Sequence, residues 1–273
     1  YLKNIRASVN QKPENENQIA VIVASGSIMD GQQPEGSIGG DTLAGIFSDL
    51  REDAKVKAIV LRIDSGGGSA FASEIIRDSI NVTRAEGVPV VVSMGSVAAS
   101  GGYWIAAETD RVLAMSTSIT GSIGVWGIIP TIDRSLAKLG VYSDGVGTND
   151  ISAMMQIDRP LSKPAQAIIQ SGVDNIYTRF LALVAVGRDS TPDEIHEIAQ
   201  GRVWTGTQAL NNGLIDEIGD LKDAIEVAAM LAGILDYTVD YPRKEMTPIE
   251  TLITELNNNI ANFLGSIGLA PKL

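Results

Sequence analysis

Residues 58–69 read AIVLRIDSGGGS, an apolar run that ends in a glycine-rich turn. Within 58–63 only Arg62 is polar, a pattern typical of a strand whose sheet has helices packed on both faces. Apolar residues at helical spacing follow at 69–86. The stretch therefore predicts a strand, a tight turn and a helix, which together make one step of a βαβ series.

The same alternation continues on both sides of this stretch. Strands are expected at 19–24, 88–93 and 111–114, with helices at 41–52 and 98–107. Right-handed crossovers and mainly parallel pairing follow from that order, so the fold class is α/β. The second half of the chain is predicted to be helical, at 163–186, 191–198, 207–212 and 220–232.

Composition limits the chemistry that this chain can perform. The 273 residues are 44% hydrophobic and 20% charged, as in globular proteins, and the net charge of −12 disfavours nucleic-acid partners. Cysteine is absent, which excludes disulfides, thiolate nucleophiles and cysteine-based metal sites. His196 is the single histidine, so a Ser-His-Asp triad has one possible base. No metal or other cofactor is expected.

The chain is expected to have three parts. Residues 1–17 are polar around Pro13 and suit a solvated linker from a preceding part of a longer protein. One domain is expected at 18–240, and an amphipathic helix and tail at 241–273. We expect this helix to pack on its own domain or a sister subunit; contact with a membrane surface is the alternative, disfavoured by an Asn-rich and acidic polar face. No apolar run reaches the roughly 18 residues of a spanning helix.

Glycine is concentrated after three of the predicted strands, at 64–69, 95–103 and 120–127. Carboxyl ends of parallel strands line the ligand crevice of an open α/β sheet, so these turns are expected to converge there. One such turn alone often only links a strand to a helix. Neither phosphate-binding glycine motif is present, which argues against a nucleotide site. The residues expected at the crevice are Gly66, Gly68, Gly102, Gly121 and Ser122.

Two further glycines and a serine suggest acyl transfer. An oxyanion hole needs two donors aimed at the point where carbonyl charge develops, and the amides of Gly67 and Gly101 are candidates. Ser100 lies directly before Gly101, at an expected helix start whose dipole favours an anion. Ser100 is therefore the candidate nucleophile.

Five blocks of the chain resemble the signal peptide peptidase A family, also called protease IV. They are residues 58–69, 90–95, 98–104, 120–125, and 203–206 with 212–216. The likeness spans roughly 18–235 and is strongest to the C-terminal half of the long, two-repeat bacterial form. It implies a Clp/crotonase-like fold, ring-like homo-oligomers, an inner-membrane enzyme facing the periplasm and cleavage of leftover signal peptides. It also implies that Ser100 is the nucleophile, with Gly67 and Gly101 at the oxyanion positions.

The resemblance implies a lysine base, which the long form takes from its N-terminal half. The matching stretch here, VYSDGV at 141–146, has no lysine. We therefore expect the base to come from the missing half and the chain alone, a soluble piece, to have little or no activity. Lys138 and Lys163 are expected to be solvated. A second departure is Asp64-Ser65-Gly66, where the family usually has Asn-Ser-Pro.

Other candidate residues have simpler interpretations. His196 is expected to be an ordinary surface histidine, and the acids at 49–53 and 193–194 are expected to be solvated helix ends. Trp104 and Trp126 follow glycine-rich blocks and either wall the crevice or pack beneath it.

Three functions remain open. The first is a serine peptidase subunit that acts on peptides. The second is a crotonase-type acyl-CoA lyase or hydratase, which would need acids at the crevice and basic residues for the CoA phosphates. The third is a non-catalytic assembly module.

Overall fold

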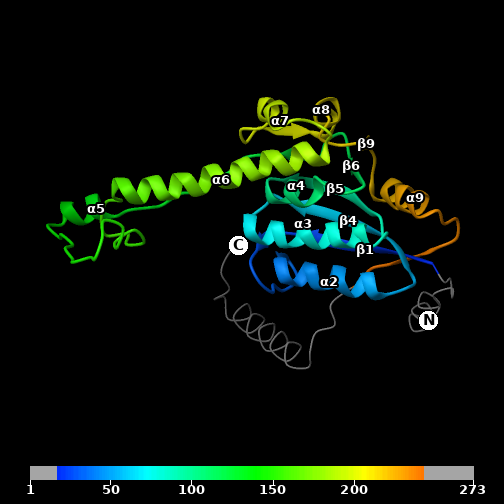
Figure 1. Cartoon of the computed structure of the whole chain (residues 1–273), viewed down its shortest axis with the longest axis horizontal. Coiled ribbons are helices and arrows are strands. Elements are labelled where there is room, and N and C mark those ends of the chain that lie inside the picture. The colour runs from blue at the N-terminus through cyan, green and yellow to red at the C-terminus, as the bar shows by residue number, and fades with distance from the viewer. Residues whose placement is uncertain (1–16, 243–273) are drawn as a thin grey trace, which may run out of the picture. The chain divides into compact units, whose positions relative to one another are not determined.

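The structure is a computed structural model that describes residues 17–242 (Figure 1). The expected linker, apart from residue 17, and the helix and tail expected at 241–273, apart from residues 241–242, lie outside the described residues. Contacts divide the chain into two compact units, Tyr1–Tyr241 and Pro242–Leu273. The elements in chain order are β1 (Gln18–Ser25), β2 (Ser27–Met29), β3 (Ser37–Gly39), α2 (Gly40–Glu52), β4 (Val56–Ser65), α3 (Ala70–Ala85), β5 (Val90–Ala99), α4 (Gly101–Ala106), β6 (Arg111–Ala114), β7 (Ile119–Gly121), α5 (Asp133–Lys138), α6 (Lys163–Gly187), α7 (Pro192–Ile198), β8 (Val203–Thr205), α8 (Gly206–Asn211), β9 (Glu217–Ile218), α9 (Leu221–Ala232) and β10 (Thr238–Asp240).

The main sheet has the strand order β10-β1-β4-β5-β6-β9, and every pair along this path is parallel. The series β1-α2-β4-α3-β5-α4-β6 supplies its centre. Central strand β4 is buried on both faces: Ile59, Leu61 and Ile63 belong to the larger core with α2 and α3, while Ala58 and Val60 pack with α9. This double covering explains the continuous apolar run at 58–63.

The edge of the sheet at the carboxyl end of β5 differs from the expected helix and loop. Residues 98–99 were expected to open a helix, but Ala98 and Ala99 continue β5 and pair with Thr120 and Gly121 of β7. The helix begins only at Gly101. The helix start at residue 98 was therefore wrong, because pairing with β7 extends the strand to Ala99.

The long helix α6 is buried only toward its C-terminal end, apart from Ala165 near its start. Phe180, Leu183, Val184 and Ala185 pack in the larger core. Figure 1 shows α5 beside the other end of α6, away from the sheet. Within residues 17–242, no helix combines the length and apolarity needed to cross a bilayer.

Candidate active site

Ser100 lies at the junction between β5 and α4, in a backbone conformation that is rare for residues with a side chain. Its φ is +53° and its ψ is −120°. The peptide N–H of Ser100 donates to Gly121 O (2.9 Å), and its carbonyl accepts from Tyr103 N and Trp104 N (2.9 Å each). The hydroxyl makes no capping bond to the helix that it precedes. Backbone strain of this kind is concentrated at functional sites. At Ser100 it occurs together with a hydroxyl that caps no helix.

Gly67 and Gly101 lie against Ser100, as expected. A Cβ on Gly67 would be 2.6 Å from Gly101 N and 2.8 Å from Ser100 Cβ, and the φ of Gly67 is +99°. Gly101 is the first helical residue of α4, so its N–H has no acceptor within the helix. The N–H of Gly67 donates to Ser65 Oγ (3.1 Å). One candidate oxyanion donor therefore already has a weak hydroxyl acceptor, which a ligand oxygen would have to replace.

A cavity of about 730 Å³ opens at this point. Its wall includes Ser100, Gly101 and the turn 66–68, together with Trp104 and Trp126, so both tryptophans line the crevice. Gly102, Gly121 and Ser122, also expected there, are not part of this wall. The complete lining is Gly26, Ser27, Asp64, Ser65, Gly66, Gly67, Gly68, Ala70, Val97, Ser100, Gly101, Trp104, Gly124, Val125, Trp126, Ile176 and Phe180.

The three residues outside the wall instead support it. Gly102 allows α4 to approach β4, because a Cβ there would be 2.9 Å from Ser65 O. Gly121 supplies the carbonyl that accepts from the Ser100 N–H. Ser122 donates its N–H to Arg202 O (2.7 Å).

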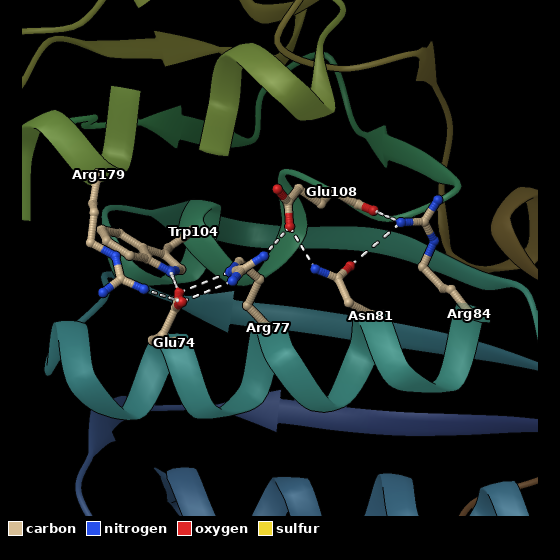
Figure 2. Close-up of polar contacts among 7 residues, drawn as sticks. All are labelled: Glu74, Arg77, Asn81, Arg84, Trp104, Glu108 and Arg179. Carbon is tan, nitrogen blue, oxygen red and sulfur yellow. Dashed lines mark hydrogen bonds and ion pairs between the residues drawn. The ribbon is translucent and has the colours of Figure 1, made fainter. Parts of the chain in front are cut away.

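One side of the cavity is apolar. A residue of that side, Trp104, is held in place by the carboxylate of Glu74, which the sequence analysis did not identify. The rings of Trp104 and Phe180 lie 4.7 Å apart, with Ile176 beside them in the wall. Trp104 Nε1 donates to Glu74 (2.9 Å), which also accepts two bonds from Arg77 (2.8 Å each) and one from Arg179 (2.6 Å) (Figure 2). The Arg77 bonds are the largest cause that lowers the pKa of Glu74 to about 2.

The cluster around Glu74 continues along α3. Arg77 also pairs with Glu108, which accepts from Asn81 Nδ2 (2.6 Å), and Arg84 bonds the carbonyl of Glu108 (Figure 2). These contacts tie α3 to the end of α4, while Arg179 ties it to α6. The spacing of Glu74 and Arg77 is that of an i,i+3 ion pair, a signal visible in the sequence. Their other partners, Trp104 and Glu108, lie 30 or more residues further along the chain and give no such signal.

Neither a lysine nor a histidine lines this cavity among residues 17–242. Lys138 and Lys163 are exposed and are not part of the wall. His196 also lies outside the wall, where Nδ1 is 2.9 Å from the Tyr177 hydroxyl and Nε2 is 3.0 Å from Gln200 Nε2. The described wall includes no lysine or arginine, so it offers no cation for the phosphates that an acyl-CoA lyase would bind.

Comparisons with known proteins agree with this geometry. The profile described as Peptidase family S49 matches residues 82–235. The chain is 46% identical over 246 residues to Protease 4 of Salmonella typhi, covering 90% of this chain and 40% of that protein. It is 36% identical over 222 residues to the chloroplastic serine protease SPPA of Arabidopsis thaliana, covering 80% of this chain and 33% of that protein. The chain thus spans less than half the length of both relatives.

The fold also matches a solved structure. The membrane-bound stomatin-specific protease 1510-N, solved as a mutant, aligns with a TM-score of 0.53 and 16% identity. The alignment covers 84% of this chain and 99% of that one. At this identity the match concerns the fold alone, and it confirms the expected Clp/crotonase-like α/β fold.

Proposed function

Since the chain belongs to Peptidase family S49, we propose that it is the nucleophile-bearing part of a serine endopeptidase, with Ser100 as the nucleophile. The observation that carries the proposal is the strained Ser100 at the wall of the 730 Å³ cavity, with its hydroxyl free of the helix. A serine placed there for packing alone would have no need of a positive φ.

The oxyanion hole of this proposal is formed by the amides of Gly101 and Gly67. Both groups belong to backbone in direct contact with Ser100. When the peptide oxygen becomes negative, the N–H of Gly67 exchanges its bond to Ser65 Oγ for a stronger, charge-assisted one. The bond is thus strengthened in the transition state, which is the requirement for catalysis.

The general base is a lysine from outside this chain, supplied either by a preceding half of the same protein or by a sister subunit in a homo-oligomer. Support comes from the described cavity wall, which has a nucleophile and no lysine or histidine. The neutral amine takes the Ser100 proton while Oγ attacks the carbonyl carbon. The ammonium then protonates the leaving amine as the C–N bond breaks, and water hydrolyses the acyl-Ser100 ester with the same amine as base.

The substrates are extended apolar peptides, and signal peptides released at the bacterial inner membrane, on its periplasmic side, are the proposed natural source. Trp104, Phe180 and Ile176 give the cavity an apolar side suited to aliphatic side chains. The glycines at 66–68 leave backbone groups accessible to an extended chain.

A fluorophosphonate probe tests the assignment, because it reacts with an activated serine and reports each chain separately. We expect labelling of this chain only when the base-bearing polypeptide is added, and no labelling of Ser100→Ala under any condition. The Ser100→Ala variant should still assemble and unfold cooperatively. Labelling of that variant at the wild-type rate would refute the nucleophile, and absence of labelling in the complete wild-type protein would favour a non-catalytic assembly role.

A further inference from the structure

The described cavity wall has a single charged side chain, and the mechanism above does not use it. That residue is Asp64, which is exposed near the end of β4, three residues before Gly67. The other lining side chains are small, hydroxylated, aliphatic or aromatic. Asp64 is therefore the one group of the described wall that can attract a cation by its charge.

The carboxylate of Asp64 is held in place rather than left free to rotate. Its Oδ1 accepts a hydrogen bond from the peptide N–H of Val97 (3.1 Å). Its Cγ lies over Gly95, where a Cβ would be only 2.9 Å away, so the absence of a side chain at 95 makes room for it. A carboxylate fixed in this way needs little further ordering when it binds a ligand.

No positive charge of the described chain neutralises this group. The ion pairs within residues 17–242 do not include Asp64. Arg62 is two residues earlier in β4, but its Nη1 donates to Ser93 Oγ (2.9 Å) and Met94 O (3.1 Å), and Arg62 is not part of the cavity wall.

We propose that Asp64 is a specificity-determining residue that binds a cationic group of the substrate peptide, a Lys or Arg side chain or an N-terminal ammonium. This inference rests on the proposed peptidase function. Trp126, which is 80% exposed and lines the same cavity, is a second side chain of a type that attracts cations. The cavity therefore combines an apolar side for aliphatic groups with one anionic point for a basic group.

A substrate cation fits Asp64 better than the catalytic lysine does. A carboxylate beside an ammonium stabilises the protonated form and raises its pKa, whereas the base must be neutral to accept the serine proton. Pairing Asp64 with that lysine would thus suppress the reaction. A substrate cation carries no such penalty.

Binding measured by isothermal titration calorimetry tests the proposal without requiring turnover. Three apolar peptides of equal length are compared: one acetylated with an internal Lys, one acetylated with Gln in its place, and one with Gln and a free N-terminal amine. We expect at least one cationic peptide to bind the 273-residue chain about fivefold more tightly than the neutral peptide at low salt. The cationic peptide that shows the preference identifies the source of the positive charge.

The variant Asp64→Asn keeps an oxygen for the Val97 N–H and removes only the charge, so we expect it to fold and to lose the preference. Asp49→Asn, on the exposed side of α2, changes the net charge equally and should keep it. In the wild type, raising the salt concentration should shrink the preference, a measurement that needs no variant.

Equal binding of all peptides, or a preference retained in Asp64→Asn, would overturn the role of Asp64 alone. No peptide binding at all would also count against the proposed function. Faster fluorophosphonate labelling of Asp64→Asn in the complete protein would show that Asp64 pairs with the base instead, and would equally overturn the proposal.

Discussion

At the scale of single residues, the backbone of Ser100 is strained, and its side chain makes no helix-capping bond that would offset the cost. The φ of +53° is accessible to glycine at little cost, and the hydroxyl makes no capping bond that a substitution would remove. Ser100→Gly should therefore stabilise the protein by about 0.5–1 kcal/mol relative to Ser100→Ala, which keeps the strain. Urea unfolding of the two variants measures the difference. Equal stability of the two variants would show that this conformation costs a residue with a Cβ no more free energy than it costs glycine, and would contradict the strain.

Gly67 offers a second test at the same scale, because the turn contains a matched control. In Gly67→Ala, the new Cβ would lie 2.6 Å from Gly101 N at a φ of +99°, so either α4 shifts or the turn opens. We expect a loss of about 2 kcal/mol or more in unfolding free energy and a loss of probe labelling in the complete protein. Gly66→Ala, also in the cavity wall but with open space at its Cβ, should change stability by less than about 1 kcal/mol. Similar losses in both variants would contradict the contact argument.

The residues around Ser100 divide into those that sequence could predict and those that it could not. Ser100, Gly67 and Gly101 follow from the position of glycine-rich turns after apolar strands, and the structure brings them into contact. Glu74 could not be found in this way, since its role depends on Trp104 and Arg179, which lie 30 and 105 residues further along the chain. The sequence of a short segment is enough to predict a turn, whereas it contains no information on which distant side chains come into contact.

At the scale of elements, α4 is a short helix that its own sequence stabilises poorly. It has six residues and opens with two glycines, which have low helix propensity. Two side-chain bonds hold it from outside: Tyr103 Oη donates to Leu214 O (2.8 Å), and Trp104 Nε1 donates to Glu74 (2.9 Å). Burial raises the pKa of Tyr103 to about 12, so this hydroxyl remains a donor at all physiological pH values.

The Glu74 contact predicts a pH dependence of stability. The pKa of Glu74 falls from 4.5 to about 2 in the folded chain, chiefly through the Arg77 bonds. The carboxylate thus stabilises the fold fully above pH 4.5, and this contribution is lost as pH falls toward 2. After allowance for solvent screening at a side chain that is 23% exposed, we expect Glu74→Gln to cost about 1–2 kcal/mol at pH 7.

Urea unfolding of wild type and Glu74→Gln at a series of pH values measures this contribution. The stability difference should shrink steadily below pH 4.5, the unperturbed pKa of the carboxyl group. Asp78→Asn, on the exposed side of the same helix, is the control and should show no such trend. A difference independent of pH would mean that packing of the Glu74 side chain, and not its charge, stabilises this region.

Prediction from sequence succeeds for elements that show their own periodicity or a clear helix start, and fails for the short strands β7 and β8. The strand β4 and the helix α3 have enough residues to show their own periodicity, and their expected bounds agree with the structure within about two residues. Strands β7 and β8 have three residues each and exist because they pair with β5 and with each other. The pairing of β7 with β5 also extended β5 into the expected start of α4, so a three-residue strand decided where α4 begins.

At the scale of the whole molecule, the segment between β7 and α6 exposes a series of large apolar side chains. Among them are Trp126, Leu139, Tyr142, Val146 and Met155, each at least 78% exposed. Isolated apolar residues on a surface are ordinary, but a concentration within one segment is typical of an interface. This segment is also continuous with the candidate site, because Val125 and Trp126 belong to the same cavity wall as Ser100.

The position of this segment predicts that association and catalysis are coupled. A polypeptide that covers residues 125–155 reaches the edge of the cavity, where the described chain provides no lysine or histidine. We therefore expect Leu139→Glu combined with Tyr142→Glu to weaken assembly about tenfold or more and to lower probe labelling of Ser100 in the complete protein, because a charge in a desolvated interface is costly. Sedimentation velocity measures assembly, and labelling measures the active site.

The control is Leu235→Glu, which adds charge at a leucine that is 95% exposed and belongs to the loop after α9. It should change neither assembly nor labelling. If the double variant assembles weakly yet labels normally at concentrations where the complex has dissociated, then the base must come from within the same polypeptide and the coupling is absent. If labelling instead falls in proportion to the complex remaining, the active site is complete only where two polypeptide segments meet, and the cavity described here is one half of it.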